Sequence, residues 1–243
     1  SKKQLGLKLG YAEDFKTYEE LFDAYKKQVT YLIDIKIEGS NIIEKIYAEY
    51  MPAPFLSIIT NDCIKKGKDY NAGGARYNTN YLQGVGIGTI TDSLAAIKYN
   101  VYDHKKFTMK ELMQALESNF ESSPVIANLV RNKTPKYGND DDFADSIAAD
   151  IVDYTEHIHL DFKTLYSHMS TGTLSISNNT PFGEMTGASA NGRKAWTPLS
   201  DGISPTQGAD FRGPTAIIKS VSKLSNDSMN IGMVHNFKLM SGL

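Results

Sequence analysis

The sequence is poor in cysteine and tryptophan, with one of each among its 243 residues. The lone cysteine, Cys63, excludes an internal disulfide and any zinc or iron–sulfur site built from several cysteines of this chain. No apolar run approaches the roughly 18 residues of a membrane-spanning helix, and the first residues lack the charged and then apolar layout of a secretion signal. We therefore expect a cytoplasmic protein with no membrane partner.

The chain also lacks an excess of charge of one sign. It carries 26 lysines and arginines against 28 aspartates and glutamates, which gives a formal net charge of -2. Nucleic-acid binders carry clustered basic residues, whereas here the two signs interleave. With 41% hydrophobic residues, the composition is that of an ordinary globular protein and predicts no nucleic-acid partner.

Two capping boxes predict where helices begin, at Thr17-Tyr-Glu-Glu20 and at Thr108-Met-Lys-Glu111. Apolar residues at helical spacing follow each box. After the first, Gly39-Ser-Asn41 interrupts the pattern, and a second stripe runs from Ile42 to Tyr50. Two prolines end that stripe, and we expect a short buried helix from Phe55 to Ile64.

A glycine-rich stretch, Gly67 to Gly88, predicts a long irregular connection. Its segment Gly84-Val-Gly-Ile-Gly88 lacks both the third glycine of the dinucleotide fingerprint and the Lys-Ser/Thr of a phosphate loop. We therefore interpret it as a tight packed loop, not a nucleotide site. Thr91 or Asp92 is expected to cap the next helix.

The last third of the sequence alternates apolar and polar residues. Leu174-Ser-Ile-Ser177 predicts a strand, as does the start of Pro214 to Leu224, which then enters a loop or helix. Asn230 to Phe237 is a further candidate strand. Helices followed by short strands favour an α/β layer structure.

Candidate metal ligands give weak patterns. Asp140, Asp141 and Asp142 lack the alternate spacing of a calcium loop, so we expect Asn139 or Asp140 to cap a helix instead. His157 and His159 are two residues apart, so their side chains point in different directions and do not form a paired metal site by themselves. Cys63 is expected to be a structural thiol, because it lacks an adjacent glutamate. We therefore predict no metal site.

Two blocks resemble the glycyl radical enzymes, the family of pyruvate formate-lyase. One runs from Thr171-Gly-Thr-Leu-Ser-Ile-Ser177 through Asn191-Gly-Arg-Lys-Ala195 to Ile203-Ser-Pro205, and the other spans Gly67 to Asn78 with Asp92 to Lys98. The resemblance implies that residues 1–243 form one segment of the family's ten-stranded α/β barrel. Neither the family's Gly-Cys-Val-Glu loop nor its Arg-Val-Ala-Gly-Tyr-like radical loop occurs in the sequence.

The resemblance also implies a function for the parent protein. Thr171 to Phe182 and Asp227 to Phe237 look most like choline trimethylamine-lyase, a C–N lyase that forms trimethylamine and acetaldehyde. The alternatives are a glycyl radical diol (glycerol or propanediol) or hydroxyproline dehydratase, and a non-catalytic barrel fragment that acts as a folding or interaction module. The 243-residue chain alone is predicted to be inactive, and no catalytic residue is transferred to it.

The family further implies a glycyl radical installed by an activating enzyme that uses S-adenosylmethionine and an iron–sulfur cluster. It implies a small-molecule substrate, choline or a diol, a homodimer of the full-length protein, and a place in the cytoplasm or in a bacterial microcompartment. Within this chain, either Leu174 and Ile176 or Ser175 and Ser177 face the barrel interior, according to the register. We predict Leu174 and Ile176 as substrate-binding residues.

Overall fold

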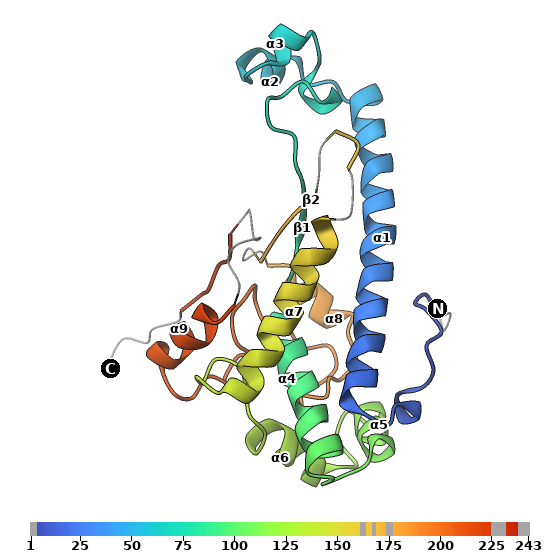
Figure 1. Cartoon of the computed structure of the whole chain (residues 1–243), viewed down its shortest axis with the longest axis vertical. Helices are drawn as coiled ribbons and strands as arrows, with labels where there is room; N and C mark the ends of the chain where they lie inside the picture. The colour runs from blue at the N-terminus through green and yellow to red at the C-terminus, as the bar shows by residue number, and fades with distance from the viewer. Residues whose placement is uncertain (1–3, 161–163, 167–168, 174–176, 225–231, 238–243) are drawn as a thin grey trace.

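The computed structural model describes residues 4–160, 164–166, 169–173, 177–224 and 232–237 (Figure 1). Its helices are Ala12–Asp14 (η1), Tyr18–Tyr50 (α1), Pro54–Ile59 (α2), Cys63–Lys66 (α3), Tyr70–Ala72 (η2), Ile87–Ile97 (α4), Lys98–Asp103 (η3, a π-helix), Met109–Glu117 (α5), Pro124–Asn132 (α6), Asp142–Leu160 (α7), Asn179–Glu184 (α8) and Pro214–Ser222 (α9). The strands are Asn80–Gln83 (β1) and Met169–Gly172 (β2). None of the helices in these ranges is long and apolar enough to cross a membrane.

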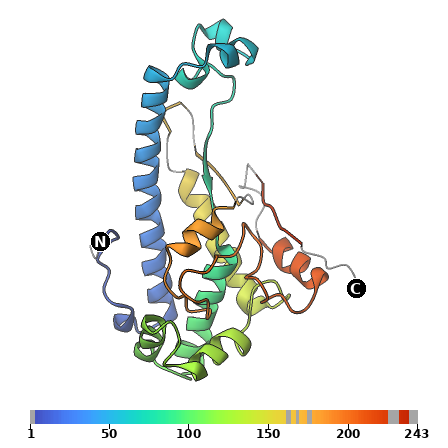
Figure 2. The ribbon, with the colours of Figure 1, turned by 180° about the vertical axis from the view of Figure 1, so that it is seen from behind.

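Helix α1 is a single helix of 33 residues that forms the long edge of the molecule (Figures 1 and 2). Its start is as predicted, because the Thr17 hydroxyl accepts the Glu20 amide and the Glu20 side chain returns to the Thr17 amide. The expected interruption at residues 39–41 is wrong. A glycine inside a helix costs only about 1 kcal/mol relative to alanine, which neighbouring turns readily outweigh.

Strands β1 and β2 pair in parallel, with Asn80 opposite Met169 and Gln83 opposite Gly172. Sequence analysis missed β1, because it lies inside the glycine-rich stretch that predicts an irregular connection. Parallel strands need a long crossover, and here the chain between them forms α4 to α7. The sheet therefore brings together residues that are far apart in the sequence.

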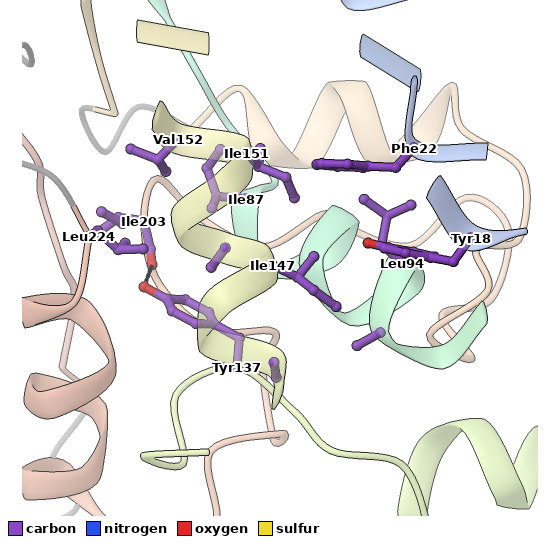
Figure 3. Packing of buried hydrophobic residues seen from close by; sticks show 13 residues of the cluster. Tyr18, Phe22, Ile87, Leu94, Tyr137, Ile147, Ile151, Val152, Ile203 and Leu224 are labelled. Atoms are coloured by element: carbon purple, nitrogen blue, oxygen red, sulfur yellow. Dashed lines mark hydrogen bonds between the residues drawn. The ribbon is translucent and has the colours of Figure 1, made fainter. Parts of the chain in front are cut away.

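The main core lies where α4 and α7 cross beneath the N-terminal end of α1 (Figure 3). Leu94, Ile147 and Ile151 are buried there against the stacked rings of Tyr18 and Phe22. Figure 3 also shows the hydroxyl of Tyr137, which donates a 3.1 Å hydrogen bond to the carbonyl oxygen of Ile203. The core thus ties the helices to the loop that carries Ile203.

The segment beyond α1 forms a protrusion, α2 and α3, at the far end of the long helix (Figure 1). The expected single buried helix from Phe55 to Ile64 is wrong in two respects. The segment forms two short helices instead of one. Two of its apolar side chains are exposed, Phe55 at 86% and Ile59 at 80%. Cys63 is buried, as expected of a structural thiol.

Three helix starts differ from the expectations. Helix α4 begins at Ile87 after Gly86 in the left-handed region, so Thr91 and Asp92 lie inside it. The N-terminal turn of α7 is capped by Asp141, whose Oδ1 accepts the Phe143 amide at 3.1 Å. From Pro214 to Ser222 the chain is helix α9 rather than a strand, consistent with proline in the first turn.

We expect Thr17→Ala to lower the free energy of unfolding by about 1 kcal/mol, because the Glu20 amide loses its acceptor at the start of α1. Urea unfolding followed by circular dichroism measures the change. The control is Thr60→Ala, since the Thr60 hydroxyl only donates back to the Leu56 carbonyl. Equal losses in the two variants would contradict the capping role.

Candidate functional site

The carboxyl ends of β1 and β2 form one side of the candidate site. Beyond the paired strands, the Gly84 amide donates to the Gly172 carbonyl at 2.9 Å. The Thr173 amide then donates to the Gly232 carbonyl at 3.2 Å, and the Val234 amide donates to the Thr173 carbonyl at 3.0 Å. Thr173 and Met233 form a parallel bridge, so a third segment joins the sheet where the strands end. Ligands in parallel α/β sheets bind at such carboxyl ends.

The two faces of this sheet differ in what covers them. Met169 and Leu82 face the helices, because they cluster with Ile33 of α1 and Ile158 of α7. Residues one position along point the other way, so Tyr81, Gln83, Ser170 and Gly172 lie on the face opposite those helices. The helices cover one face of the sheet, and the opposite face is the candidate substrate side.

Between the sheet and α7 lies a cavity of about 150 Å³. Most of its lining is apolar, yet it includes Glu156 of α7, which is fully buried, and the buried Thr173. The Thr173 hydroxyl makes no hydrogen bond to the described part of the chain. A buried carboxylate is costly to place behind a sheet, so Glu156 is an unusual member of this apolar lining.

A second cavity, of about 370 Å³, lies between α4, α6 and the loop that precedes α9. Asp92 of α4 lines it and is fully buried, and its Oδ1 accepts the Tyr137 amide at 2.9 Å. Burial raises the pKa of Asp92, while the Lys136 charge opposes that shift. Burial in turn lowers the pKa of Lys136, and the charge of Asp92 opposes it. Each of these two buried groups therefore affects the ionisation of the other.

Arg193 fixes the loop between α8 and α9. Its guanidinium donates to Ser189 Oγ at 2.8 Å and to the carbonyl oxygens of Lys194, Thr197, Thr186 and Gly187. Burial lowers the pKa of Arg193 from its high ordinary value. Because its donors are engaged by the protein's own backbone, Arg193 acts as a structural anchor rather than as a ligand for substrate.

The predicted substrate-binding residues, Leu174 and Ile176, lie outside the described residues. Sequence candidates for metal binding fall inside them. Lys223 of the segment after α9 occupies the aspartate cluster, 3.0 Å from Asp140 and 2.8 Å from Asp142 and Asp145. No group of three or more metal-ligating side chains occurs in the part of the chain that is described.

Sequence reasoning missed Asp92, Lys136 and Glu156 as buried charged residues. Asp92 carried a usable signal, because it interrupts the apolar run of the helix that begins at Ile87. An aspartate inside such a run indicates a buried partner rather than a cap. Glu156 gave no such signal, since its burial depends on the distant strand β2.

Comparisons with known proteins place these features in a family. A family model described as pyruvate formate lyase-like matches residues 1–183, and one described as glycine radical matches residues 199–243. A trans-4-hydroxy-L-proline dehydratase from Clostridioides difficile is 55% identical over 227 residues, which are 93% of this chain and 29% of that protein.

Solved structures give the same relationship. The crystal structure of hydroxyproline dehydratase from Clostridioides difficile with trans-4-hydroxy-L-proline bound matches with a TM-score of 0.92 and 53% identity, over 96% of this chain and 29% of that chain. A glycerol-bound B12-independent glycerol dehydratase from Clostridium butyricum matches with a TM-score of 0.91 and 39% identity, over 95% of this chain and 29% of that chain.

The chain thus spans 29% of the length of these relatives. Their likeness confirms the predicted fold class, an α/β arrangement that forms a portion of the glycyl radical enzyme barrel. The described sheet of β1 and β2 is a short arc of such a wall.

We expect Asp92→Ala to lower the free energy of unfolding by about 1–3 kcal/mol, since the buried Tyr137 amide loses its acceptor. Asp92→Asn keeps an acceptor and removes the charge. The folded-state pKa of Asp92 lies above the ordinary value of 3.8, so the folded state holds this proton more tightly. The contribution of Asp92 to stability therefore falls as pH rises above 3.8.

Urea unfolding between pH 4 and pH 7 tests this expectation. Wild-type stability should fall relative to Asp92→Asn as the pH rises through this range. Asp34→Asn, at an exposed position of α1, is the matched control and should follow the wild type. A wild-type curve that rises relative to Asp92→Asn would show that the charged form is the favoured one.

Proposed function

Because the chain belongs to the pyruvate formate lyase-like family of glycyl radical enzymes, we propose that it is part of a dehydratase that eliminates water from a small hydroxylated substrate. The observation that carries the proposal is the 55% identity to a trans-4-hydroxy-L-proline dehydratase over 93% of the chain. The solved glycerol dehydratase supports the same reaction class at 39% identity. Trans-4-hydroxy-L-proline is our proposed substrate.

The relatives favour dehydration over the choline cleavage suggested by the sequence blocks. In both reactions a hydrogen atom is removed from the carbon next to the one that bears the leaving group. They differ in the group that leaves, water in one and trimethylamine in the other. Choline is therefore included as a competing substrate in the assay below.

Radical chemistry is assigned to no described residue of this chain. Cys63 is buried in α3 on the protrusion, away from strands β1 and β2 near the middle of the molecule (Figure 1). By resemblance to the family, a cysteine thiyl radical would abstract the hydrogen of the substrate, and a glycyl radical installed by a separate activating enzyme would generate that thiyl. The residues here supply a wall, in which the buried polar contacts of Asp92, Tyr137 and Arg193 fix the loops around the strand ends.

We further propose that Leu174 and Ile176 line the substrate side of that wall. Ser170 and Gly172 lie on the face opposite α1 and α7, and an alternation of period two gives Leu174 and Ile176 the same parity. The apolar pair would shape the pocket around the carbon skeleton of the substrate, whereas Ser175 has the parity of the helix-covered face.

The full-length enzyme, activated anaerobically by its activating enzyme, tests the substrate. We expect kcat/KM for trans-4-hydroxy-L-proline to exceed that for choline by about 100-fold or more, because a pocket shaped for one skeleton discriminates by such factors. Product formation is followed by mass spectrometry, with glycerol as a third substrate. Preferred turnover of choline would overturn the dehydratase proposal.

Alanine substitutions test whether Leu174 and Ile176 line the substrate pocket. Leu174→Ala and Ile176→Ala should each raise KM for the preferred substrate about tenfold, because a truncated side chain leaves part of the substrate uncovered. Ser177→Ala, at an exposed turn position before α8, should change KM less than twofold, an order-of-magnitude expectation for surface changes. A larger effect of Ser177→Ala than of the two apolar substitutions would contradict the assignment of Leu174 and Ile176 to the pocket.

A further inference from the structure

A groove of about 500 Å³ lies along the C-terminal half of α1, beside the N-terminal end of β1. Its other walls are η2 and the segment that descends to β1 (Figure 1), together with Tyr166. Hydrogen bonds hold these walls to the helix. Asn71 Nδ2 donates to the Met51 carbonyl at 2.6 Å, and the Leu165 amide donates to Asn41 Oδ1 at 3.0 Å. The groove is therefore a built feature.

Aromatic side chains dominate the groove. Its lining includes the tyrosines at positions 47, 70, 77, 81 and 166. Tyr166 packs against Gly73, where an added Cβ would lie 2.7 Å from the ring, and Gly73 has a φ of +77° that suits glycine. Of these rings, even Tyr166 is 38% exposed and Tyr77 is 85% exposed. Ring faces of this kind attract cations through their quadrupoles.

A carboxylate sits among these rings. Glu44 of α1 lines the groove, and its Oε1 accepts a hydrogen bond from Asn80 Nδ2 at 3.2 Å. Its Oε2 is buried and has no hydrogen-bond partner within the described residues. Glu44 is the one charged side chain of the described lining. A buried carboxylate oxygen without a hydrogen-bond donor is unfavourable. A cationic hydrogen-bond donor stabilises such an oxygen most strongly.

We propose that the groove binds a lysine or arginine side chain from a part of the parent polypeptide outside this chain. The aromatic rings and Glu44 define the cationic chemistry of the guest. The source follows from two observations. The chain spans only 29% of its relatives' length, and exposed apolar residues flank the groove, among them Ile43 at 55%, Tyr50 at 70% and Phe55 at 86%. A macromolecular cover buries such a surface, whereas a small cation leaves it open.

The cationic chemistry is tested on the 243-residue chain with 13C-labelled tyrosine. The probes are N-acetyl-arginine amide and N-acetyl-citrulline amide, which have similar shape but differ in charge. We expect saturable shifts of tyrosine ring signals with the arginine derivative only. Glu44→Gln should weaken that binding about tenfold, while Glu49→Gln, at an exposed position of the same helix, should leave it unchanged. Equal binding of citrulline, or no binding of either probe, would overturn the proposal.

The source of the cation is tested on the full-length enzyme. There the groove should already be filled, so the arginine derivative should produce no saturable shift. Glu44→Gln should lower the thermal unfolding midpoint by several degrees more than Glu49→Gln, an order-of-magnitude expectation for one lost charge-assisted contact. Binding of the probe to the full-length enzyme as tightly as to the 243-residue chain would show an open site for a free cation and refute the side-chain guest. Neither readout depends on the substrate of the enzyme.

Discussion

The parallel pairing of β1 with β2 places Asn80–Gln83 beside Met169–Gly172 in one register. The neighbouring helices and loops are arranged around this pair of strands. Parallel strands cannot be joined by a tight turn, so the intervening chain has to leave the sheet and return. It does so through α4, the π-helix η3, α5, α6 and α7. Helix α7 then packs against the strand that follows it, and α1 covers the same face. The opposite face is left free of these helices, and it is the face that we propose for the substrate.

Buried polar contacts perform a second task, since they position loops that have little secondary structure. Asp92 holds the Tyr137 amide, the Tyr137 hydroxyl holds the Ile203 carbonyl, and Arg193 gathers carbonyl oxygens of its own loop. Thr89 and Ser200 exchange hydrogen bonds of 2.9 Å and 2.8 Å between backbone amides and hydroxyl groups. Each buried donor or acceptor without a partner is costly, so these contacts specify one loop arrangement.

The distribution of apolar surface shows which parts of the described chain remain uncovered. The N-terminal half of α1 buries Tyr18, Phe22 and Ile33, whereas Ile42, Ile46 and Tyr50 farther along remain about half exposed or more. An apolar stripe at helical spacing normally faces a core. The relatives are longer proteins, of which this chain spans 29%. The exposed half of α1 and the protrusion of α2 and α3 are therefore the surfaces where the rest of such a protein has most to bury.

The sequence by itself determined the features that depend on near neighbours and on family blocks. Both capping boxes start helices as predicted, because Thr and Glu three residues apart need only the local backbone. The resemblance indicated the fold class, whereas the proposed dehydratase function rests on comparison over the whole chain. Tertiary structure alone decided that Asn80–Gln83 is a strand and that α4 begins at Ile87, directly after Gly86. It also decided that Glu156 is buried. Each of these depends on a partner far along the chain, such as β2, that local pattern does not contain.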